Sequence, residues 1–223
     1  GKFRELGIEL IKTVKHGGVY DAISYHPDIM LHHIAEERIV YAPGTGTDML
    51  KALEFYGFKL IEGSTMLRPR YPYDIAYNVA RVGKFAFHNL KYTDFVLKKE
   101  LEKAGVELVH VNQGYTKCSV SVIDANSIIT SDKGIAKAAS KKGLDVLLIK
   151  PEENILLPGL GHGFIGGSSG MINRDKWMVA GDFETLESCG NIKKFLEKKG
   201  ISCVFVRNQP VIDIGSIIPL LTR

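Results

Sequence analysis

The chain repeats one local pattern five times, in which a helical segment ends at a glycine and runs directly into a short apolar strand. The repeated segments are GIELI (7–11), GFKLI (57–61), GVELV (105–109), GLDVL (143–147) and GISCV (200–204). The period is irregular, at roughly 40 to 55 residues, which is the range of propeller and solenoid arrays. Glycine ends a helix in the left-handed backbone conformation without strain, which explains its place in each segment. The repeat therefore predicts an array of similar α/β units.

The repeat unit also contains a capped helix and a pair of short strands. Polar side chains that accept from free backbone N–H groups predict where four helices begin, at Thr47-Asp48, Thr93-Asp94, Ser131-Asp132 and Asn191. The alternating segments between helices predict four strand pairs, AISYHPDIML with ERIVYAP, DIAYNVARV with KFAFHN, SVSVID with SIITS, and GMIN with KWMVAG. Each unit thus has the order strand, strand, helix, strand.

The fifth unit is incomplete at this level. The segment SIIPLLTR (216–223) supplies one strand, and no second strand precedes the first predicted helix. Two explanations stay open: a strand preceding Gly1 lies outside this sequence, or one unit lacks a strand. No linker or low-complexity stretch separates the units, so we expect residues 1–223 to form a single domain.

Composition excludes several classes of protein. The 223 residues are 45% hydrophobic, enough to fill a substantial core, and no apolar run approaches the roughly 20 residues that span a bilayer. The start, GKFREL, lacks the apolar core of a signal peptide, so we expect a cytoplasmic protein with no membrane contact. A net charge of +4, scattered over predicted helices, does not indicate nucleic-acid binding. Three widely spaced cysteines, Cys118, Cys189 and Cys203, indicate reduced thiols.

The stretch GHGFIGGSSG (161–170) contains the letters of a dinucleotide-binding motif, G-x-G-x-x-G. That motif needs a strand running straight into the glycines and a helix leaving them. Here the loop KPEENILLPGL precedes the glycines, and MINRDKWMVAG, which alternates like a hairpin, follows them. We therefore expect no nucleotide site, and we interpret the glycines as a place where backbone approaches backbone or a ligand.

Five such units around a pseudo-fivefold axis resemble the pentein fold, an α/β propeller of ββαβ units found in guanidino-modifying enzymes such as arginine deiminases, amidinotransferases and dimethylarginine dimethylaminohydrolases. Two segments carry the resemblance most specifically. QGYTKCSVSVIDANSIITSDKGIAKAASKKGLDVLLI resembles the family's glycine, strand, turn, strand and helix, and GFIGGSSGMINRDKWMVAG resembles the segment that holds its catalytic histidine. The chain also resembles a group of uncharacterised bacterial proteins of this fold.

The catalytic residues of those enzymes do not carry over to this chain. Where the resemblance places a nucleophilic cysteine near the C-terminus, the sequence has Pro219. Phe164 stands at or near the histidine position, and Thr116 stands near the acidic position. Proline cannot attack an amidine carbon and phenylalanine cannot transfer a proton, so the usual chemistry cannot run through these positions.

The resemblance places the beginning of each unit nearest the axis, and polar residues gather in those segments. Titratable groups that converge in this way are typical of a site. We therefore predict a polar axial pocket formed by His26, Asp28, Asp74, Asn78, Lys117, Cys118, Phe164, Gly166 and Asp213.

Three of these residues are candidates for catalysis. Cys118 can act as a nucleophile if Lys117 or His26 lowers the pKa of its thiol, and its alternative is a small buried strand residue. His26 can act as a general base oriented by Asp28, and its alternative is a His-Pro turn.

The remaining residues are candidates for binding. Asp74 and Asp213 can hold a cationic group such as a guanidinium through charge-assisted hydrogen bonds, with capping or turn formation as the alternative. Asn78, Lys117, Phe164 and Gly166 complete the predicted binding wall. His32 and His33 could be metal ligands together with His26, but adjacent strand residues point to opposite faces. We therefore predict no metal and no cofactor.

Three kinds of function are compatible with these residues. The first is a hydrolase or transferase acting on C–N bonds of a small cationic nitrogen compound, with Cys118 as nucleophile. The second is a binding protein that kept the pocket and lost the chemistry. The third is a non-catalytic interaction protein, because the fold also serves a ribosome-binding translation factor. The polar pocket favours a small-molecule ligand, and the sequence does not indicate an oligomeric state.

Overall fold

The computed structural model describes residues 2–220, which form four small sheets of three strands each. In chain order the sheets consist of β1 (Leu31–Ala35), β2 (Arg38–Tyr41) and β3 (Lys59–Glu62); β4 (Ala80–Val82), β5 (Phe85–His88) and β6 (Glu107–His110); β7 (Val120–Asp124), β8 (Ser127–Thr130) and β9 (Asp145–Leu148); and β10 (Ser169–Met171), β11 (Lys176–Val179) and β12 (Ser202–Val204). In every sheet the first two strands pair antiparallel and the second and third pair parallel.

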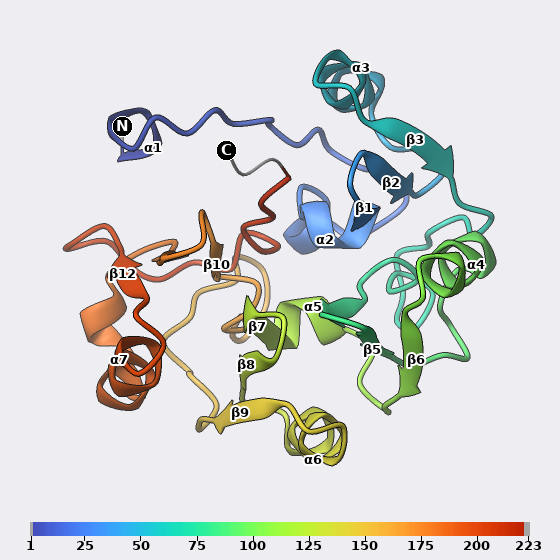
Figure 1. Cartoon of the computed structure of the whole chain (residues 1–223). Helices are drawn as coiled ribbons and strands as arrows, with labels where there is room; N and C mark the ends of the chain where they lie inside the picture. Colours follow the sequence, from blue (N-terminus) through green and yellow to red (C-terminus); the bar gives the residue numbers. More distant parts are fainter. Residues whose placement is uncertain (1, 221–223) are drawn as a thin grey trace.

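A helix connects the second and third strands of each sheet, as a parallel pairing requires. These helices are α3 (Thr47–Phe55), α4 (Phe95–Lys103), α6 (Lys133–Lys141) and α7 (Cys189–Glu197). Figure 1 shows the four units in chain order around a common centre, with these helices at the periphery. The predicted order strand, strand, helix, strand is confirmed for all four units.

The glycines predicted to end the helices do so. Gly57, Gly105, Gly143 and Gly200 each follow a helix with φ between +68° and +87°, where only glycine is free of steric strain. Gly7 also has a positive φ of 67°, after the short helix α1 (Lys2–Glu5). The predicted caps Asp94 and Asp132 accept from backbone N–H groups, whereas α3 begins after Gly46, and α7 begins after Ser188 rather than at Asn191.

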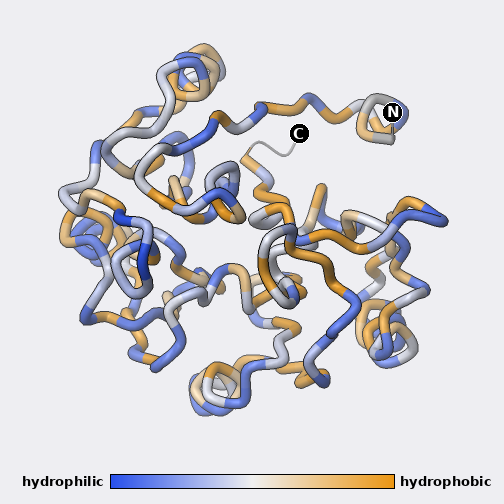
Figure 2. The backbone as a smooth tube through the Cα atoms, turned by 180° about the vertical axis from the view of Figure 1, so that it is seen from behind, coloured by the Kyte–Doolittle hydropathy of each residue, from blue (hydrophilic) through white to orange (hydrophobic). Residues whose placement is uncertain are grey.

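Each peripheral helix packs one face against its own sheet. In α6 the buried residues are Ile135, Ala136 and Ala139, and lysines follow the other face. Figure 2 shows hydrophilic and hydrophobic residues alternating along the outer helices, and a largely hydrophobic path through the C-terminal segment. The core is correspondingly divided into apolar clusters between neighbouring units, such as the one around Trp177, Phe183 and Leu196.

In the first and third units the first strand begins later than predicted, because a short helical turn precedes it. In the first unit, residues 21–30 form η1 (Asp21–Ile23) and α2 (Pro27–Met30), with Pro27 at a position where a helix tolerates its missing N–H. In the third unit α5 (Thr116–Ser119) precedes β7. A 3-10 turn, η2 (Phe183–Thr185), follows β11 in the fourth unit. The predicted axial residues therefore lie mainly on turns rather than on strands.

The prediction of a strand at residues 7–11 is wrong. Residues 7–16 form no strand, and neither do residues 216–220 of the predicted C-terminal strand, whose last three residues lie outside the described part of the chain. The physical reason is that no second strand among residues 2–220 is available to pair with either segment. In Figure 1 the N-terminal segment crosses the sector between the β10–β12 sheet and the β1–β3 sheet. The described chain therefore has four sheets, and a propeller of five blades is not confirmed.

The C-terminal segment lies against the glycines of GHGFIGGSSG. Backbone N–H groups of Ile214 and Ser216 donate to the carbonyl of Gly167 at 3.0 and 2.7 Å. A side chain at Gly167 would collide with Asp213, and one at Gly170 would collide with the backbone of Ile217. The glycines thus provide the close backbone approach that their pattern predicted.

No helix formed by residues 2–220 combines the length and the apolar character that crossing a bilayer requires.

Asp94 is a buried carboxylate that connects two parts of the second unit. Its Oδ1 accepts from the backbone N–H of Leu97 at 2.9 Å and so caps α4. Its Oδ2 accepts from the backbone N–H groups and hydroxyls of Ser64 and Thr65 at 2.7–2.8 Å. These hydrogen bonds outweigh the effect of burial and lower the pKa of Asp94 below its ordinary value.

We expect Asp94→Asn to reduce the free energy of unfolding by about 2–4 kcal/mol, because an amide N–H₂ would face N–H and O–H donors. The matched control Asp132→Asn, at the N-cap of α6, should cost about 1 kcal/mol or less. Because the folded pKa of Asp94 is lowered, its contribution is present above the unfolded pKa and is lost as the pH falls through the folded value. Urea unfolding at neutral and acidic pH measures both effects; equal losses for the two variants would contradict the assignment.

Candidate functional site

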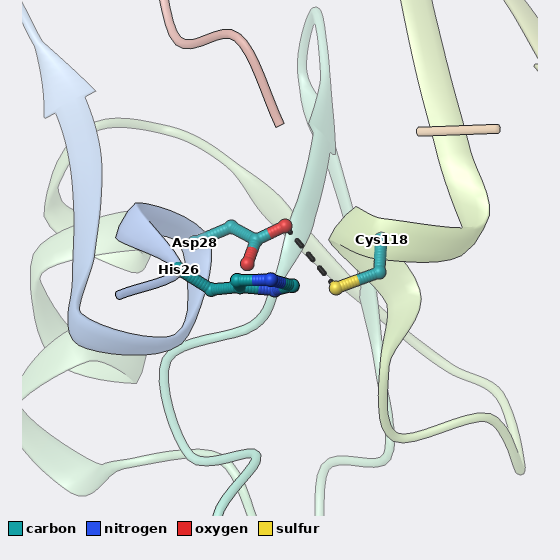
Figure 3. A group of neighbouring side chains, drawn as sticks. All are labelled: His26, Asp28 and Cys118. Carbon is teal, nitrogen blue, oxygen red and sulfur yellow. Dashed lines mark hydrogen bonds between the residues drawn. The ribbon is translucent and has the colours of Figure 1, made fainter. Parts of the chain in front are cut away.

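His26, Asp28 and Cys118 meet at the centre of the ring, and together they form what we call the central cluster. His26 is the residue before α2, Asp28 lies in its first turn, and Cys118 lies on α5. Figure 3 shows the His26 ring beneath the Asp28 carboxylate and directed toward the sulfur of Cys118. A ring nitrogen of His26, a carboxylate oxygen of Asp28 and the Cys118 sulfur all lie within 4.8 Å of one another, and the three residues are buried. The structure therefore brings together the three predicted catalytic residues.

The Asp28 carboxylate accepts hydrogen bonds at only one of its two oxygens. Cys118 Sγ donates to Oδ2 at 3.2 Å, and Ser216 Oγ donates to the same oxygen at 2.6 Å. Asp28 Oδ1 is buried and has no hydrogen-bond partner among the described residues. Because an unpaired buried carboxylate oxygen costs free energy, it marks an incomplete site.

Asp213 approaches the central cluster from the C-terminal segment. Its Oδ1 accepts from the backbone N–H of Gly215 at 3.0 Å, and its Oδ2 accepts from that of Phe164 at 2.9 Å. His26 Nδ1 lies 3.8 Å from Asp213 Oδ1, too far for a hydrogen bond, and it has no other partner among the described residues. Burial, together with the nearby charge of Asp28, raises the pKa of Asp213 above its ordinary value.

Asn78 holds the central cluster together from the second unit. Its Nδ2 donates to the carbonyl of Asp28 and to Cys118 Sγ, both at 3.2 Å. Its Oδ1 accepts from the backbone N–H groups of Lys117 and Cys118 at 2.8 and 3.3 Å. All the hydrogen-bonding capacity of the amide is thus used on the protein, so the structure gives Asn78 a positioning part where the sequence suggested contact with a ligand.

Burial and nearby charges shift the pKa values of Cys118 and Lys117. Burial and the carboxylates of Asp28 and Asp213 raise the pKa of the Cys118 thiol well above its ordinary value. Burial lowers the pKa of Lys117, against the opposing effect of Asp28, Cys118 and Asp213. The thiol is therefore protonated near neutral pH, and Lys117 does not supply the lowered thiol pKa that the sequence suggested.

A second polar group lies beside the central cluster and consists of Tyr20, Asp74 and Tyr115; we call it the tyrosine–acid group. Tyr115 Oη donates to Asp74 Oδ2 at 2.6 Å, and the hydroxyls of Tyr20 and Tyr115 lie 3.3 Å apart. Asp74 Oδ1 is buried without a partner among the described residues, and burial raises the pKa of Asp74. Burial is the main cause that raises the pKa of Tyr20. The charges of Asp74, Cys118 and Asp213 raise it further, so Tyr20 interacts with both groups.

Phe164 and Gly166 complete the predicted residues. A side chain at Gly166 would collide with the backbone of Val120 and contact the carbonyl of Lys117, so its small size serves chain packing. Phe164 borders a cavity of about 160 Å³ between the third and fourth units, whose lining includes Ser119, Asp132 and Glu152. The lining of this cavity contains no member of the central cluster or of the tyrosine–acid group.

Three residues of the site were not predicted from the sequence, namely Tyr20, Tyr115 and Ser216. Ser216 has a φ of 75°, a conformation uncommon for residues other than glycine, and it follows Asp213 closely in the chain. The signal in the sequence was that Tyr115 stands two positions before Lys117 and Ser216 three positions after Asp213. Tyr20 gave no signal, because the turn that carries it was predicted as the approach to a strand.

Comparison with protein families gives a match that spans nearly the whole chain, at residues 1–218. The chain belongs to DUF6873, a family of unknown function. A comparison with curated protein sequences gives no significant match.

Solved structures of guanidino-modifying enzymes share the fold. An amidinotransferase from Microseira wollei in the saxitoxin biosynthetic pathway matches with a TM-score of 0.59 and 13% identity, over 92% of this chain and 72% of that one. The inosamine-phosphate amidinotransferase of Streptomyces griseus matches with a TM-score of 0.57 and 12% identity, over 96% and 74%. A C. jejuni agmatine deiminase with bound substrate gives 0.54 and 13%, over 92% and 73%. The resemblance of this DUF6873 member to the pentein enzymes is thereby confirmed at the level of fold.

We expect iodoacetamide to modify Cys118 more slowly than Cys189 in the native protein near pH 7.5. Cys118 is 3% exposed and its thiol is protonated, whereas Cys189 is half-buried, so iodoacetamide reaches the Cys189 sulfur more easily. Cys203, whose pKa burial raises to about 12, serves as a slow reference. Peptide mass mapping over time gives the order. Labelling of Cys118 ahead of Cys189 would instead indicate an activated thiolate, as in the nucleophile hypothesis.

Proposed function

We propose that this DUF6873 member binds a small cationic nitrogen compound, of the amino or guanidino class, at the centre of the ring without using the residues of the pentein catalytic triad. The observation that carries the proposal is the partnerless Asp74 Oδ1, buried beside two tyrosine hydroxyls. A protonated amine or guanidinium supplies the N–H donors that this oxygen lacks.

The central carboxylates have no strong cation beside them. Among the side chains that the structure describes, no lysine or arginine nitrogen lies within 4.0 Å of Asp28, Asp74 or Asp213. Surface carboxylates of the same chain do find such partners, as Glu107 does with Lys142. Buried acidic groups are usually paired, so carboxylates that form no ion pair with a lysine or arginine favour a cationic ligand.

Aromatic rings beside Asp74 support the same class of ligand. The Tyr71 and Tyr115 rings lie 5.7 Å apart, and Tyr71 and Tyr73 are 52% and 54% exposed. The faces of tyrosine rings attract ammonium and guanidinium groups. Tyr115, which donates to Asp74, is thus packed against an exposed ring of the kind that an organic cation contacts.

The positions that correspond to catalytic residues of the pentein enzymes have other roles in this chain. Thr116 Oγ1 donates to the carbonyl of Asn78, and the backbone N–H of Phe164 donates to Asp213. If the protein catalyses hydrolysis or transfer at a C–N bond, Cys118 is the candidate nucleophile, and Asp28 is placed at 3.2 Å to accept its proton. Binding does not require this step, so we propose binding first and catalysis as its extension.

The alternative is an interaction protein that resembles the ribosome-binding translation factor of this fold and has no small-molecule ligand. It predicts that the central carboxylates stay closed to solutes. Ligand titration separates the two possibilities directly.

We expect arginine or agmatine to raise the melting temperature of the chelator-treated protein, because a ligand that binds only the folded state stabilises it. N-Butylurea, which carries a neutral ureido group and no amine, should have a much smaller effect. Asp74→Asn should weaken binding of the cation about tenfold or more, because the charge-assisted hydrogen bond is lost. Calorimetric titration gives the dissociation constants.

The matched control is Asp132→Asn, which removes a carboxylate from the N-cap of α6 outside the two central groups. It should bind the cation as the native protein does. Equal binding of agmatine and N-butylurea, or equal losses in the two variants, would contradict the proposed site. No response to any amine or guanidine would favour the interaction protein.

A further inference from the structure

The central cluster has the composition of a metal site. His26, Asp28 and Cys118 offer an imidazole nitrogen, a carboxylate oxygen and a thiol sulfur, which are the ligand types that zinc takes in proteins. They come from two turns on different units. Cys118 lies 92 positions after His26 and 90 after Asp28, so the sequence shows no spacing typical of a metal site. Their convergence is visible only in the folded protein (Figure 3).

Two unpartnered atoms give independent support. His26 Nδ1 and Asp28 Oδ1 are both buried and lack hydrogen-bond partners among the described residues. His26 and Asp28 are 5% and 1% exposed, so water does not readily satisfy these atoms. Two orphaned ligand atoms on neighbouring side chains are expected where a cation is the missing partner.

The separations fit one ion. A tetrahedral zinc ion with bonds of about 2.0–2.3 Å holds its ligand atoms about 3.3–3.8 Å apart. Cys118 Sγ lies 3.2 Å from Asp28 Oδ2, and the three ligand atoms lie within 4.8 Å of one another. Side-chain movements of about an ångström or less would bring all three separations into this range.

The charges also fit a divalent ion. With the thiol deprotonated, Asp28, Asp213 and Cys118 carry one negative charge each. Lys117 lies close enough for all three to influence it electrostatically. Even with Lys117 positively charged, the four groups sum to a net charge of −2, which one divalent cation neutralises.

We propose that His26, Asp28 and Cys118 bind one zinc-class divalent metal ion. Binding replaces the thiol proton of Cys118 by the metal and releases that proton to solvent, so one H⁺ leaves for each ion bound. Ser216 continues to hold Asp28 Oδ2, and Asp213 stands beside His26 outside the coordination shell. Three protein ligands leave a fourth position open to water or a ligand, the arrangement of catalytic rather than structural zinc sites.

This inference is tested separately from the organic-cation proposal, whose decisive atom is Asp74 Oδ1 and whose titration uses chelator-treated protein without added metal. The two therefore fail separately. If the protein binds arginine but no metal, the organic-cation proposal stands and the metal proposal fails. If it binds metal but no arginine, the reverse holds.

The test is titration of the chelator-treated, full-length protein with Co²⁺, followed by competition with Zn²⁺. We expect one Co²⁺ per chain, a thiolate-to-cobalt charge-transfer band in the near ultraviolet, and loss of the band when Zn²⁺ displaces cobalt. Mg²⁺ should not compete, because it prefers oxygen ligands. Absence of stoichiometric binding, or binding without the thiolate band, would overturn the proposal.

Variants assign the band to the central cluster. The double variant Cys189→Ser/Cys203→Ser leaves all three ligands intact and should keep the full band, which assigns the thiolate to Cys118 even if variants of the cluster do not fold. Cys118→Ser should abolish the band, and His26→Gln and Asp28→Asn should weaken binding about tenfold or more. Circular dichroism confirms the fold of each. Loss of the band in the double variant would place the metal elsewhere and overturn the proposal.

Discussion

The amide of Asn78 is the interaction on which the centre of the molecule depends. It comes from the second unit, donates to the backbone of Asp28 in the first, and accepts from the backbone of Lys117 and Cys118 in the third. One side chain thereby connects three units, each of which has its own sheet. Because the bonds to Asp28 and Cys118 are buried, replacing the amide by an apolar group would remove the partners of the Asp28 carbonyl and the Cys118 backbone N–H at the point where the units meet.

Much of the architecture could be predicted from the sequence because it depends on local rules. The glycines at 57, 105, 143 and 200 must adopt a conformation that favours glycine, and they marked the ends of all four peripheral helices. The strand at residues 7–11 failed for the opposite reason. Its letters match the repeat, but whether a strand forms depends on a partner elsewhere in the chain, which local pattern does not report.

The candidate site was predictable only in part. The argument that polar residues at the start of each unit face the centre gathered His26, Asp28 and Cys118, and the structure places them together. It could not distinguish ligand contact from internal support, so Asn78 and Gly166 were predicted as binding residues although their contacts are with the protein itself. It also missed Tyr20 and Ser216, which reach the centre through tertiary contacts that no spacing encodes. The shared fold of the solved pentein enzymes does not decide among these roles, since chemistry depends on the side chains in the site.

The C-terminal segment closes the ring without forming a sheet, and this gives the site an unusual dependence on the completion of the chain. Ser216 and Asp28 are 188 positions apart in sequence and joined by a hydrogen bond of 2.6 Å. A nascent chain that contains only the first three sheets still lacks Asp213, Ser216 and the backbone hydrogen bonds that Ile214 and Ser216 make to Gly167. The centre is therefore complete only when residues 213–216 are present, and a chain that ends before them lacks both the Asp213 carboxylate and the Ser216 hydrogen bond to Asp28.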